Sequence, residues 1–349
     1  ITAHAQRNGM KDVERRILAR HLALAVQPAE KMQAIAARMR FEESAGNNAA
    51  AAQEAEALLK ENSRSMGAIR TAVNYYARSN AKPRAAQILL AAAPNAYPEL
   101  RRQFHLEAIQ KLIDGGDYAA AHTETAKLLT ADPIDERVLA LKADAFARAK
   151  DDRGLSTLYR DAIAQVQKSP LAAPAKAARI ALLRRGWIPA LLRMNDSTGA
   201  TDQYIELIKV YPEDVALLGE ASRSAQRDRL TAYFSKAEQD SPKDARWPIV
   251  RARLEQESAN YDSALSAWGR AVALRPERVD LLANRASLEE RLGRFNEAVA
   301  SNRKLYEISF KNGEWLVQGA RVLARQGKND ECVKWLREGL IDNRPASAN

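Results

Sequence analysis

The sequence predicts an all-α protein, a right-handed solenoid (superhelix) of about nine or ten antiparallel helix hairpins. Three observations predict it. Alanine is abundant while aromatic residues make up only 6% of the 349 residues, and this composition favours closely packed helices over sheets. Apolar residues recur at helical spacing. The C-terminal third repeats itself with a period of about 34 residues, which is typical of stacked helical units.

The repeat consists of columns of similar residues that share one register. Three successive units carry aromatic, leucine, alanine, glycine or other small residues at matching places. The columns are Trp247, Leu281 and Trp315; Ala252, Ala286 and Ala320; Tyr261, Phe295 and Asn329; Ala264, Ala298 and Cys332; and Gly293 with Gly327.

Each unit predicts two helices joined by a short turn. In the first unit, Trp247, Val250 and Leu254 form one apolar stripe of the first helix. The turn follows at 259–260, and its counterparts in the next two units contain glycine, which suits a left-handed residue that ends a helix. The second helix should stop at Pro276, because proline cannot continue it.

This pattern resembles the tetratricopeptide repeat (TPR) family. The match is best in the second helix of the first unit, and it continues through the glycine-containing turn of the next one, where Asn302 and Phe310 depart from the motif. The residues that match are Tyr261, Ala264, Trp268, Ala271, Pro276, Gly293, Phe295, Ala298 and Gly327. The resemblance implies that the first helix of each hairpin lines a concave groove that holds a segment of another protein.

Before this array the register is weaker. We expect degenerate TPR-like repeats over 1–173, with helices over 32–45, 49–60, 66–77 and 84–92, followed by two better units around 102–133 and 139–170. An irregular helical segment is expected over 174–212. There, 186–189 should break a helix and 195–199 should form a loop. The C-terminal TPR array should occupy 213–344, with a polar tail at 345–349.

The sequence offers no constellation typical of catalysis, so we expect no enzyme, no cofactor and no metal. The four histidines, His4, His21, His105 and His122, lack the spacing of metal ligands. The single cysteine stands in a packing column, and the adjacent carboxylates 42–43 and 289–290 are expected on solvated helix faces. No apolar run of about 18 residues indicates a membrane span.

The candidate binding residues come from the groove positions that the TPR resemblance implies. Arginine recurs there, and its guanidinium can hold a carboxylate through two hydrogen bonds, so we expect a protein or peptide partner with acidic residues. The family's carboxylate clamp for chaperone tails is not expected, since Ala283 and Val317 occupy its lysine positions. The candidates are Arg148, Arg246, Arg253, Gln256, Ser287, Arg291, Arg321 and Arg325.

The principal hypothesis is therefore a non-catalytic interaction scaffold. One alternative is a TPR module of a larger multidomain or membrane- or secretion-associated protein, since the chain opens with Ile1 rather than Met. Another is nucleic-acid binding through the basic surface, given the net charge of +10. That alternative is less favoured because few exposed aromatic residues are expected and the sequence contains no recognised nucleic-acid motif. The sequence assigns no compartment and no oligomeric state.

Overall fold

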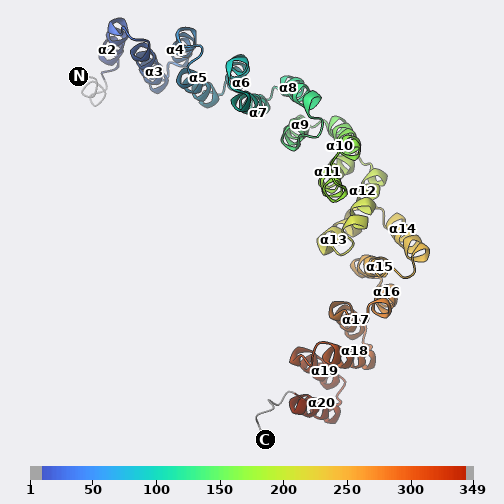
Figure 1. The fold of residues 1–349 in the computed structure, drawn as a ribbon. Coiled ribbons are helices and arrows are strands. Elements are labelled where there is room, and N and C mark those ends of the chain that lie inside the picture. The colour runs from blue at the N-terminus through green and yellow to red at the C-terminus, as the bar shows by residue number, and fades with distance from the viewer. Residues whose placement is uncertain (1–9, 343–349) are drawn as a thin grey trace. The chain divides into compact units, whose positions relative to one another are not determined.

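The computed structural model describes residues 10–342, and within that range the chain forms nineteen α-helices, one short 3₁₀ helix and no strand (Figure 1). The chain divides into two compact units, Ile1–Ser169 and Pro170–Asn349. Each unit is built from consecutive helices that pack as neighbours. The predicted all-α fold of stacked antiparallel helix pairs is confirmed.

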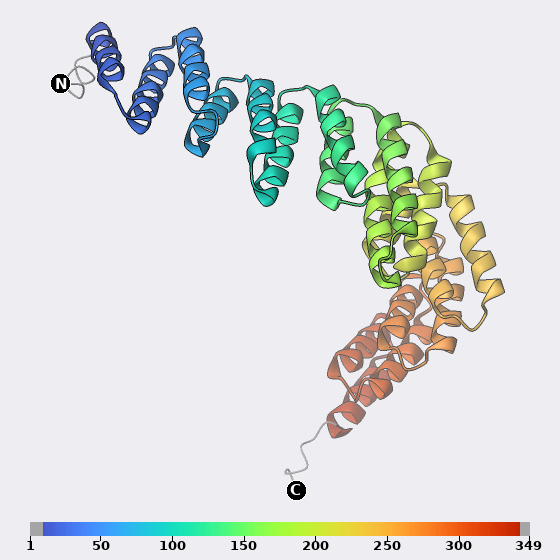
Figure 2. The same cartoon turned by 45° about the horizontal axis from the view of Figure 1, so that its top comes forward.

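Unit 1 contains helix α2 followed by four hairpins, α3–α4, α5–α6, α7–α8 and α9–α10, whose paired helices lie side by side (Figure 2). Its elements are α2 (Lys11–Leu24), α3 (Pro28–Ser44), α4 (Asn48–Glu61), α5 (Met66–Arg78), α6 (Lys82–Ala92), η1 (Ala93–Asn95), α7 (Pro98–Asp114), α8 (Tyr118–Ala131), α9 (Glu136–Arg148) and α10 (Asp152–Lys168).

Unit 2 contains five helix pairs, from α11–α12 to α19–α20. We call the first helix of each pair, with an odd number, helix A, and the second helix B. The elements are α11 (Ala173–Arg193), α12 (Ser197–Val210), α13 (Val215–Ser224), α14 (Arg227–Asp240), α15 (Arg246–Glu257), α16 (Tyr261–Leu274), α17 (Val279–Arg291), α18 (Phe295–Ile308), α19 (Gly313–Arg325) and α20 (Asn329–Asp342).

One residue with positive φ closes the turn from helix A to helix B in eight of the nine pairs. Glycine takes this position in four turns, as the sequence predicts for two of them. The other four turns place an L-residue there at a cost of roughly 1 kcal/mol or more. The eight residues, in chain order, are Gly46, Asn80, Gly116, Lys150, Asn195, Ala259, Gly293 and Gly327.

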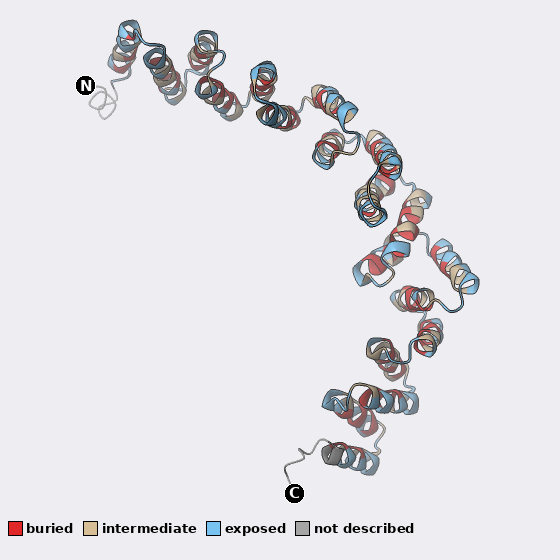
Figure 3. Ribbon diagram, in the orientation of Figure 1, coloured by how far each residue is buried: buried red, intermediate tan, exposed pale blue. Residues whose placement is uncertain are grey.

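The buried residues of each unit lie mainly where neighbouring helices face each other (Figure 3), and they include both small and large side chains. Ala252 and Ala264 are fully buried at the crossing of α15 and α16, so these backbones approach closely. Trp268 fills the space beside them and is also fully buried. Alanine therefore allows the close helix contacts, and the larger side chains fill the space between hairpins.

The pair α13–α14 is the exception to this pattern. Its connection at 225–226 has no residue with positive φ among the described turns, and α13 has only ten residues. The two helices have little mutual contact (Figure 1). Each of them packs instead on α12 and on α15.

The predicted helix break at 186–189 is wrong. Helix α11 continues through Gly186 and Pro189. Pro189 is exposed, so its ring points to solvent and the carbonyl that lacks an N–H partner can be hydrated. Ile188 and Ala190 are buried on either side of it, and their packing holds the helix together. Tertiary contacts thus override the local preference.

The loop predicted at 195–199 is also too long. Helix α12 begins at Ser197, because the carboxylate of Asp196 caps it by accepting a hydrogen bond from the Gly199 N–H at 2.8 Å. Only 194–196 form the turn. The predicted tail at 345–349 lies outside the described residues.

Candidate functional site

The A helices of unit 2 form one row, in which α13 packs directly on α15, while the B helices α12 and α14 pack on each other (Figure 1). We call the surface that α13, α15, α17 and α19 present the A-helix face. Seven of the eight candidate residues belong to these helices. Arg148 belongs to unit 1.

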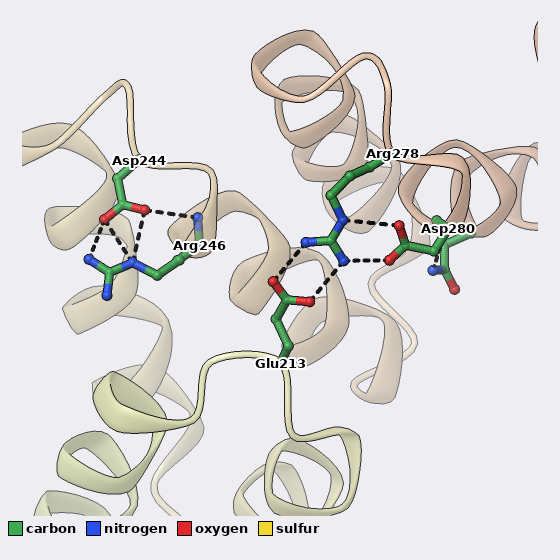
Figure 4. Close-up of polar contacts among 6 residues, drawn as sticks. Glu213, Asp244, Arg246, Arg278 and Asp280 are labelled. Atoms are coloured by element: carbon green, nitrogen blue, oxygen red, sulfur yellow. Dashed lines mark hydrogen bonds and ion pairs between the residues drawn. The ribbon is translucent and has the colours of Figure 1, made fainter. Parts of the chain in front are cut away.

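Two ion-pair groups mark the edge of the A-helix face where its helices begin (Figure 4). Arg278, which precedes α17, binds Glu213 through Nη1 at 2.7 Å and Nη2 at 2.8 Å. The same guanidinium binds Asp280 through Nε at 3.0 Å and Nη2 at 2.6 Å. These hydrogen bonds lower the pKa of both carboxyl groups and raise that of Arg278. Arg278 is therefore fully engaged and connects the starts of α13 and α17.

Arg246 is engaged in the second group. Its Nη2 donates to Asp244 Oδ2 at 2.6 Å, and its backbone N–H donates to Oδ1 of the same carboxylate at 3.1 Å. Its guanidinium also lies over the Trp247 ring, 5.0 Å from the centroid. This candidate is exposed, but a partner's carboxylate would have to compete with Asp244.

Arg253 and Gln256 meet at the Trp268 indole. The Arg253 guanidinium lies 5.4 Å from the centroid of an indole ring, and its buried Nε has no hydrogen-bond partner. The Trp268 Nε1–H donates to Gln256 Oε1 at 3.2 Å. The structure thus brings these two predicted residues together, with Gln256 satisfying a buried donor and Arg253 half-buried beside it.

Arg291 and Arg325 each lie in the last turn of an A helix. The Arg291 guanidinium lies over the Tyr261 ring at 4.3 Å from its centroid. Arg325 forms an ion pair with Glu290 of the preceding A helix. In unit 1, Arg148 occupies the same place in α9 and pairs with Asp114 of α7 at 3.2 Å.

Arg321 differs from the other arginine candidates. It lies on α19 and is exposed. Within residues 10–342 no hydrogen bond, ion pair or ring contact engages its guanidinium.

A small cavity of about 100 Å³ lies between α17, α18 and α19, and the candidate Ser287 is one of its lining residues. Two carboxylates, Glu290 and Glu314, also line it. Repeat position alone does not predict Glu314 as a lining residue, because its placement depends on how α17 and α19 face each other. The remaining lining residues are Ala283, Ala286, Asn302, Trp315 and Gln318.

The expectation that paired carboxylates lie on solvated faces is wrong for two of them. Glu289 is 1% exposed and accepts hydrogen bonds from Ser301 Oγ at 2.6 Å and Arg285 Nε at 2.7 Å. Glu42 is 7% exposed and accepts from Arg15 and Asn47. Adjacent residues on a helix face different directions, so one of each pair turns toward the neighbouring helix.

No group of three or more His, Cys, Asp or Glu side chains in the described part of the chain could hold a metal ion. His122 stacks on Phe146 with ring centroids 3.9 Å apart, and burial lowers its pKa. None of the helices between residues 10 and 342 is both long and apolar enough to cross a membrane.

No protein-family model matches the chain, and no curated protein matches it in sequence. Among solved structures, the chain is similar to MamA, with 16% identity, a TM-score of 0.32, and coverage of 46% of this chain and 91% of MamA. A tetratricopeptide repeat protein from Parabacteroides merdae shows 16% identity and a TM-score of 0.29 over 70% of this chain and 94% of that one.

A third similar structure is Naa15/Naa10 bound to HypK-THB, with 11% identity, a TM-score of 0.29, and coverage of 96% of this chain and 66% of that chain. Values this low transfer no function to this protein. The fold assignment depends on the helix pairs and turns described above.

Proposed function

We propose that this protein is a non-catalytic interaction scaffold whose A-helix face in unit 2 binds a segment of another protein. The single observation that supports it best is Arg321, an exposed arginine with no partner within the described residues, on the helix that also lines the cavity beside Ser287. An unengaged guanidinium can form two hydrogen bonds with a carboxylate of the partner without first breaking an internal pair.

The other arginines would contribute differently. Arg246 and Arg325 already have carboxylate partners, and Arg253 and Arg291 lie over aromatic rings. Their guanidinium charges are therefore largely balanced or directed at a ring face, and they shape the surface. We expect affinity to come from apolar contacts over several repeats, with Arg321 contributing to selectivity and association rate.

A selection from a displayed random-peptide library, with the intact chain as bait, tests this proposal. Peptides that combine an acidic residue with apolar residues should be enriched. A selected peptide should bind the Arg321→Glu variant about tenfold more weakly in calorimetry, since a charge-assisted hydrogen bond is replaced by repulsion.

The matched control is Arg337→Glu, which makes the same charge change at an exposed position of the B helix α20. Its affinity should equal that of the wild type. Enriched peptides without acidic residues, or equal losses in both variants, would contradict the assignment of Arg321. Retention of random nucleic acid at moderate salt would favour the nucleic-acid alternative.

A further inference from the structure

A larger cavity lies in unit 1, separate from the A-helix face of unit 2. It has a volume of about 510 Å³ and opens between α8, α9 and α10. Cavities of this size commonly hold small organic molecules. Most of its wall is apolar and comes from Leu129, Pro133, Leu139, Phe146, Leu158 and Ala162.

The Phe146 wall of this cavity is held in place from two sides. The His122 ring stacks on one side of the Phe146 ring, with centroids 3.9 Å apart. On α10, Gly154 leaves the space that the ring needs, because a Cβ there would lie 2.3 Å from the Phe146 ring. The cavity is therefore already shaped before anything enters it.

One ammonium group lies in this apolar surrounding. Lys142 lines the cavity and is half-buried, and burial lowers its pKa. Asp161 exerts the opposite, weaker electrostatic effect. Within the described residues, no hydrogen bond or ion pair engages Lys142 or Arg153, which also lines the cavity.

The two carboxylates that line the cavity already have donors. Asp151 caps α10 by accepting from the Gly154 N–H at 2.8 Å. Asp161 accepts from Arg160 Nε at 3.1 Å. The carboxylates that line the cavity thus already accept hydrogen bonds, whereas Lys142 and Arg153 have no hydrogen-bonded or ion-paired partner within the described residues. This difference favours an anionic ligand over a cationic one.

We propose that this cavity binds a small apolar carboxylate, with its hydrocarbon part against Phe146 and Leu158 and its carboxylate on the Lys142 ammonium. A neutral apolar ligand would displace water from Lys142 without replacing its hydrogen bonds, and that loss would weaken binding. Arg153 would assist at the rim. The site is independent of the peptide-binding function proposed for unit 2.

Calorimetric titration of the intact chain with octanoate tests the proposal, and octanamide is the uncharged comparison. Octanoate should bind at least about tenfold more tightly than octanamide. Lys142→Met should weaken octanoate about tenfold and remove the preference. Lys168→Met, at an exposed lysine that ends the neighbouring helix α10, should change neither affinity.

A second variant tests the cavity without removing the charge. Thr157 is exposed and lines the cavity, so Thr157→Trp should fill it and abolish octanoate binding while the fold is retained. Thr123→Trp, on the exposed face of α8 and away from the cavity, should bind as the wild type does. Absence of octanoate binding, equal affinity for octanamide, or full binding by Thr157→Trp would each overturn the proposal.

Discussion

At the residue scale, the turns between paired helices depend on single residues in the left-handed conformation. Ala259 has φ of 59° between α15 and α16, and it is exposed. Its methyl group therefore contributes no packing there and only adds strain. The sequence column that holds glycine in the next two units already indicates that glycine suits this place.

Ala259→Gly should therefore raise the free energy of unfolding by about 1 kcal/mol, because the relieved strain exceeds the extra flexibility of the unfolded chain. Urea denaturation followed by circular dichroism measures it. Ala300→Gly, at an exposed position inside α18, is the matched control and should lower stability by about 1 kcal/mol. The same sign for both variants would show that Ala259 is not strained.

At the element scale, charged residues connect helices that are distant in sequence. Three ion pairs join the last turn of one A helix to the same place in the A helix one repeat earlier. These pairs are Arg78 with Glu43, Arg148 with Asp114, and Arg325 with Glu290. Each is partly exposed and therefore screened by solvent, so these pairs orient neighbouring hairpins more than they hold them together.

The ion pairs of Arg278, at the edge where the first helices of the pairs begin, should make the stability of unit 2 depend on pH. Its hydrogen bonds lower the pKa of Glu213 and Asp280, so their stabilisation is complete at pH 7. It is lost as the pH falls below about 4, through the lowered pKa values of the folded state. Arg278→Met should thus be less stable than the wild type at neutral pH, and the difference should close in acid.

Thermal unfolding of both proteins between pH 7 and pH 3 measures this difference. Arg337→Met removes the same charge from an arginine that contacts no carboxylate within the described residues. That control should follow the wild type at every pH. If the difference in thermal stability between the wild type and Arg278→Met stays the same from pH 7 to pH 3, the ion pairs are not its cause.

The elements of the C-terminal array could be predicted from sequence, because the columns around Ala252, Ala264 and Trp268 are packing positions that recur with the period. The continuation of α11 through Pro189 could not, since it depends on buried neighbours rather than on local preference. The ion pairs of the A-helix face could not be predicted from the sequence either. A partner one repeat away, such as Glu290 for Arg325, becomes apparent only when the helices are placed.

At the scale of the whole molecule, the chain consists of two compact units divided between Ser169 and Pro170. Each unit has its own buried clusters, and stacking of neighbouring hairpins supplies the core in both. We therefore expect each unit to keep its structure when the connection is cut.

A protease recognition sequence inserted after Ser169 tests this expectation. Cleavage should leave the helical circular dichroism signal unchanged, and both fragments should stay folded. The same insertion after Asn260, in the turn between α15 and α16, is the control and should destabilise unit 2 on cleavage, because it cuts within one closely packed hairpin. Loss of about half the helical signal after the first cut would contradict the division.

The short helix α13 should affect where unit 2 unfolds locally. It lacks the close contact with its own second helix that every other pair in the unit has, and neighbours on either side hold it instead. We therefore expect the backbone amides of α13 to exchange with solvent faster than those of the other first helices in unit 2, so that local opening also starts inside the unit. A ligand that contacts both α12 and α15 should slow this exchange, because it would hold together the two helices on which α13 packs.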